Sequence, residues 1–255
     1  MEFNAHQRQV FLSLVKDLNN QHIKYTILRG FEDLPFSFSG GDVDMLVNQE
    51  CFNDMIRICN LHGFDKKLNF INGFKNLAKL GIEMPYLTVK RLLSNPLESI
   101  SAVKDILKDG NSYESLSANF QSLVLHNSGI KLHVVNHLAY TSPMNGNLIR
   151  INPKVEKRSL ESSIINKNYF FKHLSEPDEL LHLTCRGVFD YGGSFPDYYV
   201  DRIHELNSSM TNAECESLKS NLDLVFYAAS DLVYESICSN SIENLHTNLI
   251  QFSNY

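Results

Sequence analysis

Apolar residues recur at helical spacing near the start of the chain and at strand spacing soon after it. Between residues 5 and 20 they fall at intervals that predict an amphipathic helix. The segment 23–30, IKYTILRG, is rich in β-branched and aromatic residues and ends at a glycine, which predicts a strand. A loop over 31–41, with Pro35 and two adjacent glycines, then leads into a second strand, DVDMLV (42–47).

The same alternation of patterns continues along the chain. We expect a helix over about 49–61, a third strand at 64–71, and a hairpin whose arms, 123–126 and 130–136, flank the turn HNSG. A polar connector over 143–153 is followed by mostly helical periodicity. Helix starts are expected at Ser175 as an N-cap and at the capping-box pair Thr211 and Glu214.

These elements predict an α+β fold in two parts. The first part, 1–145, is an α/β domain with a small mixed or antiparallel sheet flanked by helices, and the second part, 146–255, is an all-helical domain. At 255 residues and 43% hydrophobic residues, the chain is long enough to bury an ordinary core.

Charge and cysteine usage narrow the class of protein. A net charge of -6 and a pI near 5.9 argue against an extended nucleic-acid footprint, although they allow a local basic pocket. The five cysteines are scattered and odd in number, and we expect them to be reduced core thiols. With no signal peptide and no apolar run of membrane-spanning length, the expected location is the cytoplasm, with no membrane partner.

Two carboxylates stand in the second strand. Alternation of side chains puts Asp42 and Asp44 on one face, while Val43, Met45 and Val47 face the core. Two such neighbours repel unless a cation lies between them, and Mg²⁺ is the cation that prefers carboxylates together with substrate phosphates. The alternative is a strand end where both aspartates emerge into solvent.

The stretch ILRGFEDLPFSFSGGDVDMLV carries a resemblance. A strand ending in Gly30, a spacer over 31–41, and Asp42-Val43-Asp44 on the next strand resemble the nucleotidyltransferase superfamily that includes DNA polymerase β. The form LRG…LP…DVDMLV is similar to small bacterial members linked to surface-glycan gene sets. The segment PDELLHLTCRGVFDYGGSFPDYYVDRIHEL resembles the helical domain that follows their catalytic sheet.

The resemblance implies an enzyme that moves a nucleotidyl group from an NTP to a small-molecule acceptor. Asp42 and Asp44 would hold Mg²⁺, and the turn Arg29-Gly30-Phe31 would face the phosphates, although Phe31 is bulkier than the residue usual there. Lys66 and Arg186 are further candidates for phosphate binding. A solvated lysine, and an Arg186 paired with Asp190 at i+4, are the structural alternatives.

The family's third carboxylate is missing from its expected strand, IKLHVV, where this chain has His133. Three interpretations stay open. His133 replaces the acid as a general base or as a ligand for Mn²⁺ or Zn²⁺; the acid comes from elsewhere, with Glu83 and Asp105 as candidates; or the domain is a degenerate binding module without transfer activity. A toxin or antitoxin-type enzyme acting on RNA or protein is a further alternative, and the acidic pI argues against RNA.

Overall fold

The computed structural model describes residues 2–38, 41–66, 120–142, 148–245 and 249. The chain forms two compact units. The first unit comprises Met1–Ile23 and Asp33–Asn136, and the second comprises Lys24–Glu32 and His137–Tyr255.

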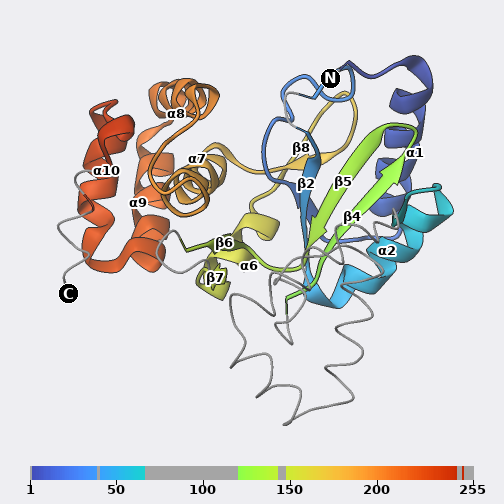
Figure 1. Cartoon of the computed structure of the whole chain (residues 1–255), viewed down its shortest axis with the longest axis horizontal. Coiled ribbons are helices and arrows are strands. Elements are labelled where there is room, and N and C mark those ends of the chain that lie inside the picture. The colour runs from blue at the N-terminus through green and yellow to red at the C-terminus, as the bar shows by residue number, and fades with distance from the viewer. Residues whose placement is uncertain (1, 39–40, 67–119, 143–147, 246–248, 250–255) are drawn as a thin grey trace, which may run out of the picture. The chain divides into compact units, whose positions relative to one another are not determined.

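The first unit is built on a mixed sheet with the strand order β3-β4-β5-β2. Strands β2 and β5 are parallel, whereas β4 is antiparallel to both of its neighbours; the bounds are β2 Val43–Val47, β3 Asp65–Lys66, β4 Ser122–Asn127 and β5 Ile130–Val135. Helices α1 (Ala5–Asn20) and α2 (Phe52–Leu61) lie next to each other beside these strands, and the 3₁₀ turn η1 (Gln49–Cys51) precedes α2 (Figure 1). This mixed sheet confirms the predicted α+β class.

The β4–β5 hairpin has a two-residue turn. Ser128 and Gly129 have φ angles of 50° and 88°, the left-handed conformation that a type I′ turn requires at both positions. Gln7 on α1 donates from its side-chain nitrogen to the Ser128 carbonyl at 2.8 Å. The same Gln7 completes a capping box with Asn4, so one side chain fixes the start of α1 and ties the turn to it.

Strand β2 is buried on both faces. All five of its residues are buried, including Val43, Met45 and Val47, which were expected to face the core, and Asp44. Burial of Asp44 contradicts the alternative in which both aspartates emerge into solvent, because a strand covered on both faces has no solvent side. The carboxylate of Asp44 is therefore held inside the unit, while Asp42 precedes the strand and is partly exposed.

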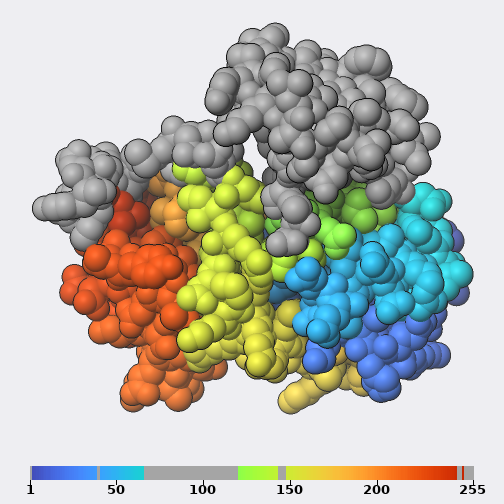
Figure 2. Space-filling model, turned by 90° about the horizontal axis from the view of Figure 1, so that it is seen from below, coloured from blue at the N-terminus to red at the C-terminus, as the bar shows by residue number. Residues whose placement is uncertain are grey.

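The second unit combines short strands with helices. Strand β1 (Tyr25–Ile27) runs parallel to β9 (Lys172–His173), β9 pairs antiparallel with β8 (Ile164–Ile165), and β6 (Ala139–Thr141) forms a ribbon with β7 (Leu148–Arg150). The helical segments are α6 Pro153–Glu161, α7 Glu176–Cys185, the π-helix η3 Arg186–Asp190, α8 Asp197–Ser209, α9 Asn212–Phe226, η4 Tyr227–Ala229, α10 Ser230–Cys238 and η5 Ile242–Asn244. Helices α9 and α10 pack against each other and form the orange-red surface in Figure 2.

Several element predictions need correction. The stretch 146–255 is not all-helical, because β7, β8 and β9 lie within it. These strands are two or three residues long, too short for a period of two to show in the sequence. The strand expected at 23–30 spans only Tyr25–Ile27, and that expected at 64–71 is described only as Asp65–Lys66, the rest lying outside the described residues.

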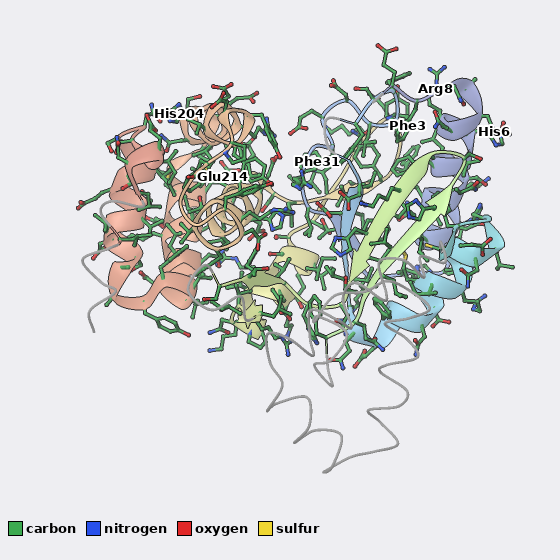
Figure 3. All side chains as sticks on the ribbon, viewed as in Figure 1. Phe3, His6, Arg8, Phe31, His204 and Glu214 are labelled. Atoms are coloured by element: carbon green, nitrogen blue, oxygen red, sulfur yellow. The ribbon has the colours of Figure 1, made fainter. Side chains whose placement is uncertain are left out.

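The predicted helix caps have mixed outcomes. Thr211 and Glu214 form the expected capping box, with Glu214 labelled in Figure 3. Ser175 occupies the N-cap position in extended conformation, but its hydroxyl donates to Asp178 at 2.6 Å and makes no cap hydrogen bond. The Ser175 hydroxyl is therefore directed at the Asp178 carboxylate, and its oxygen accepts no backbone N–H of the first turn.

The structure also bears on two further predictions, that the cysteines are core thiols and that the chain has no membrane-spanning segment. All five cysteines are free thiols, yet only Cys59 and Cys185 are buried, so the expectation of core thiols is wrong for Cys51, Cys215 and Cys238. Burial raises the pKa of the Cys59 thiol to about 12. Among the helices that the structure describes, none combines the length and the apolar character needed to cross a bilayer.

Candidate metal centre

The site is built by two parallel strands of the first unit. Their register pairs Asp44 on β2 with His133 on β5, and Lys131 lies two residues before His133 on the same strand face. Two contacts cross between the strands: Nδ1 of His133 lies 3.0 Å from Oδ1 of Asp44, and Nζ of Lys131 lies 3.2 Å from Oδ2 of Asp42. An Asp-x-Asp pattern thus faces a Lys-x-His pattern.

Asp42, Asp44 and His133 form a compact group of potential ligands. One ligand atom from each lies within 4.8 Å of the other two. At this separation two ionised carboxylates repel by at least about 3 kcal/mol for an effective dielectric constant of about 20. A bound cation would remove that cost, and two carboxylate oxygens with one imidazole nitrogen can coordinate it. The grouping of these three residues is what the sequence predicted.

Lys131 supplies a positive charge at the same place. Its side chain is 39% exposed and pairs with Asp42, itself 21% exposed. A partly exposed ion pair of this kind contributes about 0–1 kcal/mol, so its loss is a small obstacle to a divalent cation. Lys131 therefore offsets part of the negative charge of the two aspartates without preventing a cation from binding to them.

The turn predicted to face phosphates lies in the second unit. Gly30 has a φ of 62°, which explains the glycine at this turn. The ring of Phe31, labelled in Figure 3, lies 4.3 Å from the ring of His173, a packing contact between side chains of the same unit. The conformation at Gly30 suits a close backbone approach, while phosphate binding by Gly30 and Phe31 stays a prediction.

The predicted arginines come together around one tyrosine. Burial raises the pKa of the Tyr199 phenol, and the guanidinium groups of Arg186 and Arg29 both oppose that rise. Arg186 also forms the i+4 ion pair with Asp190 that was its structural alternative, at 3.4 Å. Arg29 and Arg186 thus both act on the Tyr199 phenol, Arg186 with Asp190 beside it, and their binding of phosphate stays a prediction.

Some predicted candidates have no described side chain. Lys66 lies in β3, and its backbone pairs with Leu125 of β4. Glu83 and Asp105, the candidates for a third acid, lie outside the described residues. In the part of the chain that the structure describes, His133 is the third potential ligand beside Asp42 and Asp44.

Two residues of the site were missed in the sequence. Lys131 was not among the predicted site residues, and Ser122 was left outside the predicted strand 123–126. In the structure the Ser122 hydroxyl lies 2.8 Å from Nε2 of His133. The signal that could have found Ser122 is the two-residue turn at Ser128-Gly129, because it fixes the pairing of every residue in the hairpin. The contact of Lys131 with Asp42 depends on the long-range parallel pairing of β2 with β5, which has no local signal in the sequence.

Three tyrosines of the second unit pack on one another. Tyr191 and Tyr198 both meet Tyr199 edge to face, with ring centroids at 5.7 and 4.6 Å. Edge-to-face contacts of this kind are ordinary packing between aromatic side chains. Tyr199 is buried, whereas Tyr191 and Tyr198 are exposed.

Comparison with known proteins gives no match to any family model, curated protein or solved structure. The resemblance to the nucleotidyltransferase superfamily therefore depends on the motif around Gly30, Asp42 and Asp44 and on the helical segment that begins at Pro177.

Proposed function

We propose that this protein is a metal-dependent nucleotidyltransferase that moves a nucleotidyl group from an NTP to a small acceptor. The observation that carries the proposal is the gathering of Asp42, Asp44 and His133, whose ligand atoms lie within 4.8 Å of one another. The proposal also draws on the resemblance of the Gly30–Asp44 motif to that superfamily.

The donor set bears on the choice of cation. Asp42 and Asp44 offer oxygen atoms, which suit Mg²⁺, whereas His133 offers a nitrogen that Mg²⁺ accepts poorly. A cation that tolerates both ligand types, such as Mn²⁺, suits these residues better than the Mg²⁺ that the resemblance implies. When bound, it would neutralise phosphate charge and polarise the α-phosphate.

The residues of the chain have separate roles in this proposal. The carboxylate of Asp44, 5% exposed, provides a fixed anionic ligand inside the unit. Asp42, which is partly exposed, provides the second carboxylate. Its ion pair with Lys131 would break when the carboxylate binds the cation. His133 completes the ligand set from the neighbouring strand, where the superfamily has an acid.

A second candidate is supported by the ion pairs. Asp42 with Lys131, and Asp44 with His133, pair each carboxylate with a potentially positive group and no metal. A domain held in this way fits the degenerate binding module, which keeps the fold of the site without transfer activity. The two candidates differ in whether the site takes up a cation.

Calorimetric titration with MnCl₂ and MgCl₂ tests the proposal. We expect Mn²⁺ binding to the wild type that is weakened roughly 100-fold or more in Asp44→Asn, because second-sphere partners alone contribute about 10–100-fold to metal affinity. Asp54→Asn, an exposed aspartate on α2, is the matched control and should bind as the wild type does. Wild-type protein that takes up no cation would leave the binding module as the better candidate.

A second measurement separates a metal site from a transferase. NTPs are titrated into the Mn²⁺-loaded wild type, and pyrophosphate release is followed with a mixture of sugar and alcohol acceptors. Nucleotide binding that needs Mn²⁺ and is lost in Asp44→Asn supports transfer. Cation binding without any nucleotide binding would contradict the proposed activity while keeping the metal site.

A further inference from the structure

His133 links two side chains through its two ring nitrogens. Nδ1 lies 3.0 Å from Oδ1 of Asp44, and Nε2 lies 2.8 Å from Oγ of Ser122. The three residues come from three adjacent strands of the first unit, β2, β5 and β4. Ser122 reaches the imidazole because Val124, two residues further along β4, is the direct partner of His133.

The order carboxylate, imidazole, hydroxyl is the order that activates a serine. A carboxylate can only accept, so the hydrogen bond to Asp44 requires a proton on Nδ1 of His133. In the neutral ring this leaves the lone pair on Nε2, directed at the Ser122 hydroxyl. Such an arrangement lets the imidazole take the hydroxyl proton as the oxygen attacks an electrophile.

Of the three residues, the carboxylate of Asp44 is buried, and His133 and Ser122 are partly exposed, as this chemistry requires. Asp44 is 5% exposed and is fixed inside the unit, where it holds the ring in one tautomer. His133 is 28% exposed, and Ser122 is half-buried, so an electrophile can approach the hydroxyl from solvent. The buried Asp44 thus orients His133, the proton acceptor, while Ser122, the nucleophile, stays partly accessible to solvent.

We propose that Ser122 is a nucleophile towards activated acyl esters in the metal-free protein, with His133 as its general base and Asp44 as the positioning residue. Oγ of Ser122 bonds to the carbonyl carbon, its proton moves to Nε2, and the ester C–O bond breaks as that proton passes to the departing alkoxide. Water then attacks the acyl-serine, gives a proton to the same nitrogen, and releases the acid and the free serine.

The proposal also makes the cation an inhibitor of Ser122. A cation bound through Nδ1 of His133 uses the lone pair there, and the neutral ring then carries its proton on Nε2. That nitrogen donates to Ser122 and can no longer accept its proton. The nucleophile and the metal centre therefore exclude each other, although the reactivity of Ser122 without metal does not depend on the proposed transferase activity.

The test uses a fluorophosphonate probe on the full chain in EDTA, followed by intact mass and peptide mapping. Ser122 displaces fluoride from phosphorus, and we expect one adduct per chain on Ser122. His133→Gln and Asp44→Asn should slow labelling at least 100-fold, and Ser122→Ala should abolish it. Ser13→Ala, an exposed serine on α1, is the matched control and should label as the wild type does. Circular dichroism establishes that each variant is folded.

Two outcomes would contradict an activated serine. The first is a wild type that forms no adduct on Ser122 in EDTA, and the second is an adduct that forms equally fast in His133→Gln. Ser122→Cys gives a second measurement, since a thiol next to His133 should react with iodoacetamide at least 10-fold faster than the exposed thiol of Cys238.

MnCl₂ separates this inference from the proposed function. If both are right, Mn²⁺ slows the labelling of the wild type. Labelling that is fast and indifferent to Mn²⁺, together with no calorimetric binding, keeps the nucleophile and removes the metal centre. Calorimetric binding without any labelling keeps the metal centre and removes the nucleophile.

Discussion

Each unit of the molecule brings acidic side chains against a basic partner, and the partners differ in kind. In the second unit the buried Glu179 receives two hydrogen bonds from the guanidinium of Arg202, at 3.1 and 2.8 Å. Glu32 lies 3.0 Å from the same guanidinium. In the first unit the partners of Asp44 and Asp42 include an imidazole and a half-exposed ammonium.

The partner decides what an acidic cluster can do. An arginine keeps its charge, presents a rigid fork to the carboxylate and has no lone pair for a metal. A histidine offers a lone pair when neutral, and a lysine at the rim can move into solvent at little cost. Glu179 is therefore a structural tie, whereas Asp42 and Asp44 form a site whose partners can be exchanged.

The largest expected change in the free energy of unfolding comes from substitution of Arg202. Arg202→Ala leaves Glu179 buried without its main partner, and breaking such a pair destabilises a fold by about 3–5 kcal/mol. We expect about 3 kcal/mol, because the carboxyl can relieve part of the cost by taking up a proton. Lys131→Ala should change the free energy of unfolding by about 0.5 kcal/mol or less. Urea denaturation at pH 8 measures both, and equal losses would remove the distinction between the clusters.

The second effect is the pH dependence of the same tie. Burial raises the pKa of Glu179 to about 7 from 4.5 and outweighs the opposing effect of Arg202. The folded state therefore binds a proton more readily than the unfolded state between these values, and stability falls as the pH rises through this window. Relative to Glu179→Gln, the wild type should gain about 3 kcal/mol in the free energy of unfolding on acidification from pH 7.5 to pH 4.5. A difference in the free energy of unfolding between the wild type and Glu179→Gln that stays the same at both pH values, measured by urea denaturation, would contradict this.

Much of the first unit could be predicted from the sequence, because its signals are local. The helix over 5–20, the strand with Asp42 and Asp44, and the hairpin that carries His133 all depend on periodicity or on turn residues. Their combination was enough to bring three ligand candidates together. What periodicity does not contain is the pairing register, so the contacts of Lys131 and Ser122 were missed.

The second unit was harder to predict for a physical reason. Strands β8 and β9 have two residues each, and their pairing is long-range, which leaves no repeated pattern in the sequence. The π-helix that begins at Arg186 continues α7, and its hydrogen bonds differ from those of α7 while the apolar pattern continues. The capping box at Thr211 does have a local signature, and it was predicted correctly.

The third prediction is that a substitution at the Asp42 cluster raises the free energy of unfolding, whereas one at the Glu179 cluster lowers it. Asp42→Asn removes one of two carboxylates that lie within 4.8 Å of each other, and it loses only a partly exposed ion pair with Lys131. We expect a gain of about 1 kcal/mol in the free energy of unfolding, as is common when charge is removed from a functional site. Differential scanning calorimetry in EDTA measures it, with Asp54→Asn as the control. A loss of stability would show that the Asp42–Lys131 pair is a structural tie like that of Glu179.

The smallest expected effect concerns Lys131 itself. If its ammonium competes with a divalent cation for Asp42, Lys131→Met should tighten Mn²⁺ binding by about fivefold, the equivalent of about 1 kcal/mol for a partly exposed pair. Lys131→Arg keeps the charge and should bind Mn²⁺ as the wild type does, and Lys16→Met removes an exposed charge from α1 as the matched control. Calorimetry at fixed ionic strength measures all three. Weaker binding in Lys131→Met would mean that the lysine supports the site, and Asp42 would then resemble Glu179 in having a partner that the fold cannot exchange.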